Sequence, residues 1–146
     1  MKYYKNTNRF WNYPIISKDR IEKIVNIIES KLEKWWKLLD YGCGDAYLKD
    51  ILNNNIDYHW IDVELEWNKD YCKQISSDNL IPFEDKYFDV VYAWEVIEHL
   101  VDTDLFIKEC HRVLKDNWSL IVTTPNLAWF LNRVFLMFWY QPYFTE

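Results

Sequence analysis

The chain has 146 residues, of which 50% are hydrophobic and 27% are charged, so it is long enough for one domain with a buried core. Its formal net charge of −6 argues against general nucleic-acid binding, because phosphate neutralisation needs clustered Lys and Arg. The sequence has no apolar run of about 18 residues, so no membrane span is expected.

The cysteines and the first residues bear on the cellular compartment. Cys43, Cys72 and Cys110 are odd in number and form no CxxC pair, so neither a disulfide framework nor a zinc site is indicated. The first ten residues, MKYYKNTNRF, lack the apolar segment of a signal peptide. Both observations favour a cytoplasmic protein with reduced thiols.

Predicted helices and strands alternate along the chain. Apolar residues recur at helical spacing over 17–34, with Ser17 as the expected N-cap. The further predicted elements are strands at 37–42, 57–64, 70–76, 87–96 and 119–125, and helices at 45–54, 102–116 and 126–140. Strands that alternate with helices predict a parallel sheet with right-handed crossovers.

The only two glycines of the chain, Gly42 and Gly44, lie in the segment DYGCGDAYL, between a predicted strand and a predicted helix. Glycine suits such a turn because the backbone can turn tightly and approach a ligand without a Cβ in the way. Asp62 ends the next predicted strand, 18 residues after Gly44. A carboxylate there can accept hydrogen bonds from ribose hydroxyls. Turn and carboxylate together predict a nucleoside site.

The chain resembles the class I S-adenosylmethionine-dependent methyltransferases over roughly residues 20–126. The resemblance is carried by five segments in the same order and spacing: LLDYGCGDAYL, WIDVE, IPFEDKYFDVVYAWEVIEHL, HRVLK and LIVTTPN. Asp40, before the glycine turn, also separates the chain from most dinucleotide dehydrogenases. The resemblance implies a doubly wound, mainly parallel Rossmann-like α/β sheet flanked by helices, with S-adenosylmethionine across the carboxyl ends of its first strands.

The resemblance also implies the residues of a cofactor site. Asp62 would face the ribose and Asp78 the adenine amino group, a place that Gln74 or Ser77 could take instead. The other expected contacts are the adenine walls Ile81 and Phe83 and, toward the methionine end, Asp40, Gly42, Cys43, Gly44, Ala93 and Glu95.

Methyl transfer does not require the protein to activate the methyl group, because a methyl group on a sulfonium is already activated. Catalysis is mainly positioning, with a base where the acceptor must lose a proton. His99 is the expected base by location, since histidine exchanges protons near neutral pH; a helix-cap role is the alternative. Glu95, Glu98 and His99 could together hold a divalent cation, but a fourth ligand is not visible, and we expect no metal.

The family sheet has seven strands, and the last two have no counterpart here. We therefore expect a single domain with an N-terminal extension at 1–16, a cofactor-binding core at 17–126, and the start of a truncated C-terminal part at 127–146. The strand at 119–125 would then be an exposed edge. Exposed edges and apolar patches favour association with another chain.

The chain contains nine tryptophans but only two glycines. Average glycine usage of about 7% predicts about ten glycines in a chain of this length. Five tryptophans occupy positions where related methyltransferases have glycine: Trp36, Trp60, Trp94, Trp118 and Trp139. These positions suggest that a UGA codon meaning glycine is written here as tryptophan; a genuinely aromatic-rich protein is the alternative.

The expected function is the transfer of a methyl group from S-adenosylmethionine to an unidentified acceptor. A non-catalytic nucleotide-binding fragment of the same fold is the alternative. An NAD-dependent dehydrogenase is a third possibility, although such enzymes typically have a more complete G-x-G-x-x-G motif than this chain has.

Overall fold

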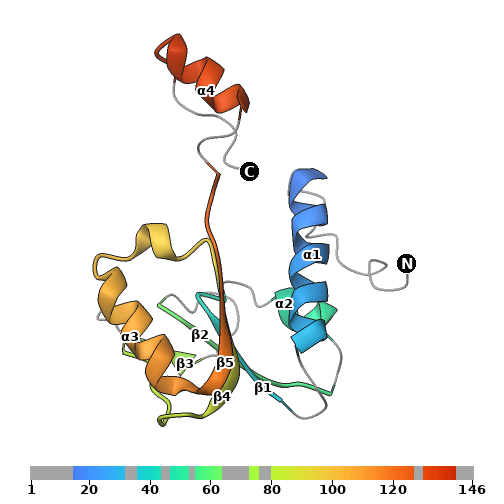
Figure 1. Ribbon diagram of the computed structural model, residues 1–146, viewed down its shortest axis with the longest axis vertical. Coiled ribbons are helices and arrows are strands. Elements are labelled where there is room, and N and C mark those ends of the chain that lie inside the picture. Colours follow the sequence, from blue (N-terminus) through green and yellow to red (C-terminus); the bar gives the residue numbers. More distant parts are fainter. Residues whose placement is uncertain are drawn as a thin grey trace.

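The computed structural model describes residues 15–31, 36–43, 47–52, 55–63, 73–75, 80–126 and 130–140. The elements in chain order are α1 (Ile15–Lys31), β1 (Lys37–Tyr41), α2 (Tyr47–Ile51), β2 (Asp57–Asp62), β3 (Lys73–Gln74), β4 (Phe88–Trp94), the 3-10 helix η2 (Ile97–His99), α3 (Thr103–Val113), β5 (Leu114–Thr123) and α4 (Phe130–Met137) (Figure 1).

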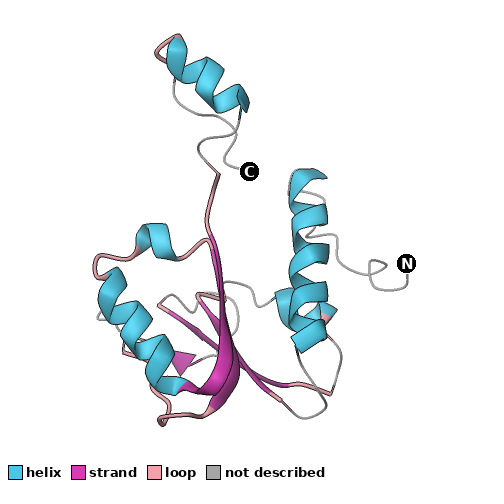
Figure 2. Ribbon diagram, viewed as in Figure 1, coloured by secondary structure: helices cyan, strands magenta, loops and turns pink. Residues whose placement is uncertain are grey.

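The strands form one parallel sheet in the order β3-β2-β1-β4-β5. β1 lies in the middle, and the chain order reverses between β1 and β4. Helix α3 covers one face of the sheet, while α1 and α2 cover the other (Figure 2). This arrangement confirms the doubly wound α/β fold.

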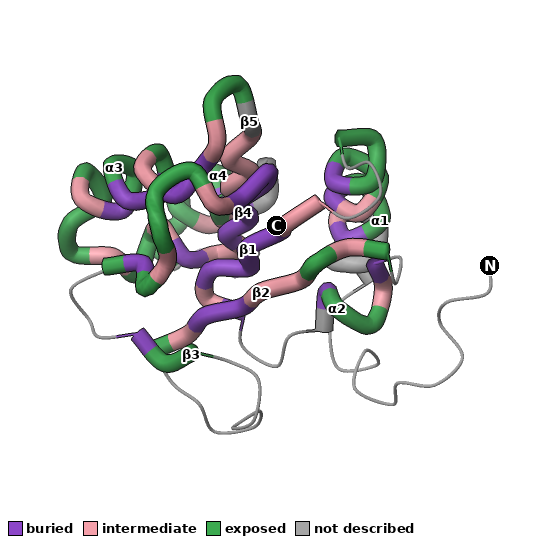
Figure 3. The backbone as a smooth tube through the Cα atoms, turned by 90° about the horizontal axis from the view of Figure 1, so that it is seen from below, coloured by how far each residue is buried: buried purple, intermediate pink, exposed green. Residues whose placement is uncertain are grey.

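Alternation along the central strands gives the sheet a hydrophobic core on each face. Leu39 and Tyr41 of β1 pack in the cluster that includes Phe106 of α3. Leu38, which precedes Leu39 and points to the opposite face, packs instead with Ile28 of α1 and with α2. Among the described residues, the central strands β1 and β4 are accordingly the most continuously buried (Figure 3). Burial on both faces explains why residues 90–94 of β4 are all apolar.

Several element bounds differ from the prediction. Helix α1 begins at Ile15, so Ser17 lies inside the helix and is not its N-cap. Of the predicted strand at 70–76, Lys73–Gln74 form β3, while residues 70–72 and 76 lie outside the described residues. Strand β5 begins at Leu114, directly after α3, because Leu114 pairs with Phe88 before a register shift. Asp45, the expected start of the following helix, lies outside the described residues.

The C-terminal part of the described chain extends away from the three-layered α/β/α body. Within the described ranges, β5 pairs with β4 alone and forms the edge of the sheet, as expected. Helix α4 stands apart from the other helices (Figure 1), and large apolar side chains on it and just after it are exposed. None of the helices described is long and apolar enough to cross a bilayer.

Among the tryptophans expected to be glycine, Trp139 has the backbone that favours glycine. Its φ is +62°, in the left-handed region. The N–H of Tyr140 donates to the Phe135 carbonyl over 3.0 Å, and that of Trp139 donates to the Leu136 carbonyl over 3.1 Å. This pair of hydrogen bonds is a Schellman motif, which ends many helices at a glycine.

The other tryptophan positions make no such conformational demand on the residue itself. Trp60, Trp94 and Trp118 lie in strands. The left-handed backbone falls on the residues next to two of them, Glu95 at φ +50° and Asn117 at φ +65°. The structure therefore supports glycine at position 139 by conformation, while recoding at the other positions stays a prediction.

Replacing Trp139 by glycine should stabilise the C-terminal end of α4. Glycine adopts the left-handed conformation without the cost of about 1–2 kcal/mol that other residues bear. Amide hydrogen exchange of α4 should therefore slow in Trp139→Gly, and Phe138→Gly, at the preceding exposed position, should not slow it. A UGG codon at position 139 would refute the recoding hypothesis for this residue.

Candidate functional site

The turn after β1 joins the ends of β1, β2 and β4. Gly42 has φ +73°, and its N–H donates to the Ile61 carbonyl at the end of β2 over 2.8 Å. The N–H of Cys43 donates to the same carbonyl over 3.3 Å. A Cβ added to Gly42 would lie 2.5 Å from Cγ2 of Val96, in the loop after β4. Glycine is thus required by the backbone angle and by the approach of Val96; Gly44 lies outside the described residues.

Two carboxylates flank this turn on neighbouring strands. Asp40, two residues before Gly42, is only 3% exposed, and its carboxylate accepts a hydrogen bond from the Tyr58 hydroxyl. Asp62 is the last residue of β2, as predicted, and its carbonyl accepts the Ile75 N–H over 2.9 Å. In a parallel sheet these strand ends lie at one edge, so both carboxylates lie near the turn.

The loop after β4 is tied to β5 and to α1. The N–H of Glu95 donates to the Thr123 carbonyl over 3.1 Å, and Glu95 Oε1 accepts from Arg20 over 2.5 Å. Arg20 also donates to the Thr124 carbonyl over 3.0 Å and lies 5.3 Å above the Trp94 ring. Ala93, in contrast, is fully buried. Sequence reasoning missed Arg20, since no local pattern connects residues 75 positions apart.

His99 lies at the end of η2, on the segment that follows Val96, and its side chain is exposed. Its N–H donates to the Val96 carbonyl over 2.9 Å. Glu98 is exposed as well, and Glu95 faces Arg20. Within the described part of the chain, no three metal-ligating side chains come together. The catalytic role of His99 stays a prediction.

The residues expected around the adenine are only partly described. Asp78 and Ser77 lie outside the described residues. Gln74 is exposed at the end of β3, and its amide donates to the Val63 carbonyl over 3.1 Å. Ile81 is 2% exposed within the core, and the Phe83 ring packs 4.8 Å from Phe88, the first residue of β4. Phe83 thus lies toward the amino end of β4, which does not support its expected role as an adenine wall.

A family model described as "Methyltransferase domain" matches residues 5–145. The chain belongs to this methyltransferase family.

Sequence relatives agree with this assignment. A Mycobacterium tuberculosis protein named "Probable S-adenosylmethionine-dependent methyltransferase" is 34% identical over 97 residues, which cover 61% of this chain and 35% of the relative. The human mitochondrial ubiquinone biosynthesis O-methyltransferase is 30% identical over 142 residues, covering 84% of this chain and 38% of that protein. The chain therefore spans little more than a third of the length of these relatives.

Solved structures share the fold of this chain. The YcgJ protein from Bacillus subtilis superposes with a TM-score of 0.66 at 16% identity, over 74% of this chain and 51% of that one. At this level of identity the likeness shows the shared Rossmann-like fold.

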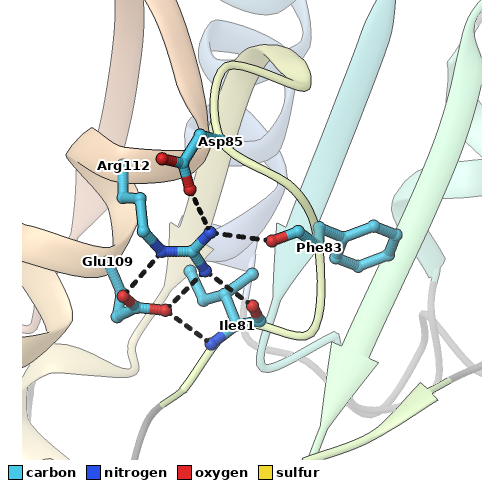
Figure 4. A network of polar contacts seen from close by, with 5 residues as sticks. All are labelled: Ile81, Phe83, Asp85, Glu109 and Arg112. Carbon is cyan, nitrogen blue, oxygen red and sulfur yellow. Dashed lines mark hydrogen bonds and ion pairs between the residues drawn. The ribbon is translucent and has the colours of Figure 1, made fainter.

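The methyltransferase domain uses α3 to hold the segment between β3 and β4 (Figure 4). Arg112 donates to the Ile81 and Phe83 carbonyls and to Asp85, each over 2.8 Å. It also donates to both carboxylate oxygens of Glu109, and Glu109 accepts the Ile81 N–H over 3.0 Å. One guanidinium and one carboxylate thus satisfy three backbone groups.

This network changes the protonation of both partners. The hydrogen bond from Arg112 lowers the pKa of Glu109 despite its burial, and the bond to Glu109 raises the pKa of Arg112. The pattern HRVLK holds Arg112, but nothing in the sequence shows that its partners are backbone groups some 30 residues away.

Cys110 is not available as a nucleophile. It is fully buried on α3, and burial raises the pKa of its thiol to about 12. A thiol that does not ionise near neutral pH is neither a good nucleophile nor a metal ligand.

Gly42→Ala should destabilise the domain in two separable ways. The left-handed angle would cost about 1–2 kcal/mol, and the clash with Val96 about 1–3 kcal/mol. In urea denaturation, Gly42→Ala/Val96→Ala should recover the second part, measured against Val96→Ala alone, and not the first. Wild-type stability for Gly42→Ala would contradict this account.

The Glu109–Arg112 pair should make stability depend on pH. Because the folded pKa of Glu109 is lowered from 4.5, its contribution is complete above that value and is lost as the pH falls through the folded pKa. Arg112→Met should lower the free energy of unfolding at pH 7 by about 1–3 kcal/mol. In this variant the free energy of unfolding should also decrease less steeply as the pH falls.

The matched control is Lys86→Met, which removes an ion pair with Asp116 in which both side chains are more than 60% exposed. Such exposed pairs contribute little, so its stability should change by less than about 1 kcal/mol. An unchanged acid profile in Arg112→Met would contradict the assigned role of the network.

Proposed function

We propose that this chain binds S-adenosylmethionine at the carboxyl edge of its sheet and serves the transfer of a methyl group to an acceptor. The observation that carries the proposal is the reversal of strand order between β1 and β4, with the left-handed Gly42 turn at that point. Ligands of doubly wound sheets bind in the crevice where the strand order reverses. The relatives named S-adenosylmethionine-dependent methyltransferases support the choice of cofactor.

The residues present are compatible with such a ligand. Gly42 presents backbone without a Cβ, and Asp62 is only partly buried at the end of the neighbouring strand, where a ribose could reach it. In the proposal Asp62 accepts hydrogen bonds from the ribose hydroxyls, and Asp78 faces the adenine. The proposed methionine end comprises Asp40, Gly42, Cys43, Gly44, Ala93 and Glu95.

When bound, the cofactor would supply a methyl group already activated by a positively charged sulfur. The protein's task is then to hold cofactor and acceptor in line. We assign His99 as the base that takes a proton from the acceptor, because a neutral imidazole accepts protons near pH 7. Its exposure on η2 leaves it accessible to an acceptor.

The proposal extends to the surroundings of the protein. The core at 17–126 is the cofactor-binding part of a single domain. A cytoplasmic location is supported by the free thiols of Cys43 and Cys110, which suit a reducing compartment. The edge of β5 is the surface proposed for association with another chain.

Asp62→Ala should weaken the binding of S-adenosylmethionine by about 1–3 kcal/mol, because the ribose hydroxyls would lose a charged acceptor. Isothermal titration calorimetry measures the change. Asp57→Ala, at the amino end of the same strand, should leave the affinity unchanged.

Wild-type affinity in Asp62→Ala would exclude the ribose role. Binding of NAD in place of S-adenosylmethionine would favour a dehydrogenase. Binding of S-adenosylmethionine without transfer of radiolabelled methyl groups to a cell extract would favour a non-catalytic fragment.

A further inference from the structure

Asp40 is a buried carboxylate at the centre of the sheet. It is 3% exposed and lies in β1, two residues before the Gly42 turn. An ionised carboxylate is costly to bury unless hydrogen-bond donors reach it. The Tyr58 hydroxyl, from the neighbouring strand β2, is such a donor. The orientation of the Asp40 carboxylate therefore depends on a residue outside the glycine turn.

The register of the sheet explains how Tyr58 reaches Asp40. Tyr58 pairs with Leu38, and Asp40 pairs with Trp60, so Tyr58 lies two residues nearer the amino end. Its side chain must extend along the strand toward the carboxyl edge to meet the carboxylate. The Tyr58 and Trp60 rings lie 5.2 Å apart, and Lys49 of α2 lies 4.3 Å from the centre of the Trp60 ring. The Trp60 ring therefore packs beside the Tyr58 ring, and Lys49 packs on Trp60.

One face of β2 carries two groups that bear on the proposed site. Because alternate residues of a strand share a face, Tyr58 and Asp62 lie on the same side of β2. Tyr58 donates to Asp40 from the start of the strand, and Asp62 stands at its end. The hydrogen-bond donor to Asp40 and the Asp62 carboxylate therefore come from the same face of one strand.

We propose that Tyr58 is a positioning residue for cofactor binding, which acts by orienting the Asp40 carboxylate toward the amino-acid end of the ligand. The inference rests on the proposed function, in which Asp40 faces the methionine end. A carboxylate accepts several hydrogen bonds at once, so a bond from Tyr58 is compatible with one from a ligand ammonium group. Tyr58 itself does not touch the ligand.

A merely structural role makes a different prediction. If Tyr58 only satisfies a buried charge, its loss lowers stability and weakens every ligand alike. If it orients Asp40, its loss weakens ligands that carry the amino-acid group and spares those that lack it. S-adenosylhomocysteine and 5′-methylthioadenosine form this pair, since they share the adenosine and differ in the amino-acid group.

The test is calorimetric binding of both ligands to Tyr58→Phe, well below its melting temperature. We expect the affinity for S-adenosylhomocysteine to fall about tenfold, the effect of one lost hydrogen bond to a charged group, and that for 5′-methylthioadenosine to stay within twofold. Tyr87→Phe is the matched control, because the Tyr87 ring stacks on Phe83 in another cluster. It should bind both ligands as the wild type does.

The double variant Tyr58→Phe/Asp40→Asn keeps the test decisive if Tyr58→Phe fails to fold, because it leaves no unpaired buried charge. It should bind S-adenosylhomocysteine as Asp40→Asn alone does, since Tyr58 acts through Asp40. A further loss in the double variant would overturn the proposal.

Unchanged binding in Tyr58→Phe, or an equal loss for both ligands, would also overturn the proposal while the proposed function stands. A wild-type protein that binds neither ligand would refute the proposed function, and this inference with it.

Discussion

The contact between Gly42 and Val96 is the constraint on which the candidate site depends. Gly42 turns the chain at the end of β1 in a left-handed conformation, and Val96 fills the space where a Cβ would lie. The same turn is hydrogen-bonded to the end of β2. Three strand ends are thereby held together at the point where the strand order reverses. A ligand bound at this reversal of strand order would meet a backbone surface that these contacts determine.

Around this point, side chains from distant segments fix what the backbone presents. Arg20 of α1 holds Glu95, and Tyr58 of β2 holds Asp40. On the other face of the sheet, Arg112 of α3 ties down the segment that leads into β4. In each case a charged side chain is hydrogen-bonded to a group from another segment, which offsets the cost of removing it from water. These bonds connect the ends of the central strands to α1, β2 and α3.

The sequence predicted the architecture well because the central strands are governed by local patterning. The apolar runs before Gly42 and Asp62 identified β1 and β2, and the observed strands lie within the ranges predicted for them. The bounds of a strand were predicted less accurately where pairing with a neighbouring strand determines them. β5 begins at Leu114, before the predicted start at 119, because Leu114 pairs with Phe88. This pairing has no signal in the local sequence.

By itself, the sequence determined the alternation of strands and helices, the glycine turn and the strand-end carboxylate, because these follow from short-range periodicity and backbone sterics. The doubly wound order was what the resemblance to the methyltransferases implied. The tertiary structure alone decided that Val96 is what a Cβ at position 42 would meet, and that Phe83 packs near the amino end of β4. It also decided the pairing of Tyr58 with Asp40 and of Arg20 with Glu95. Such contacts join residues far apart in the chain, and their geometry exists only once the sheet has brought them together.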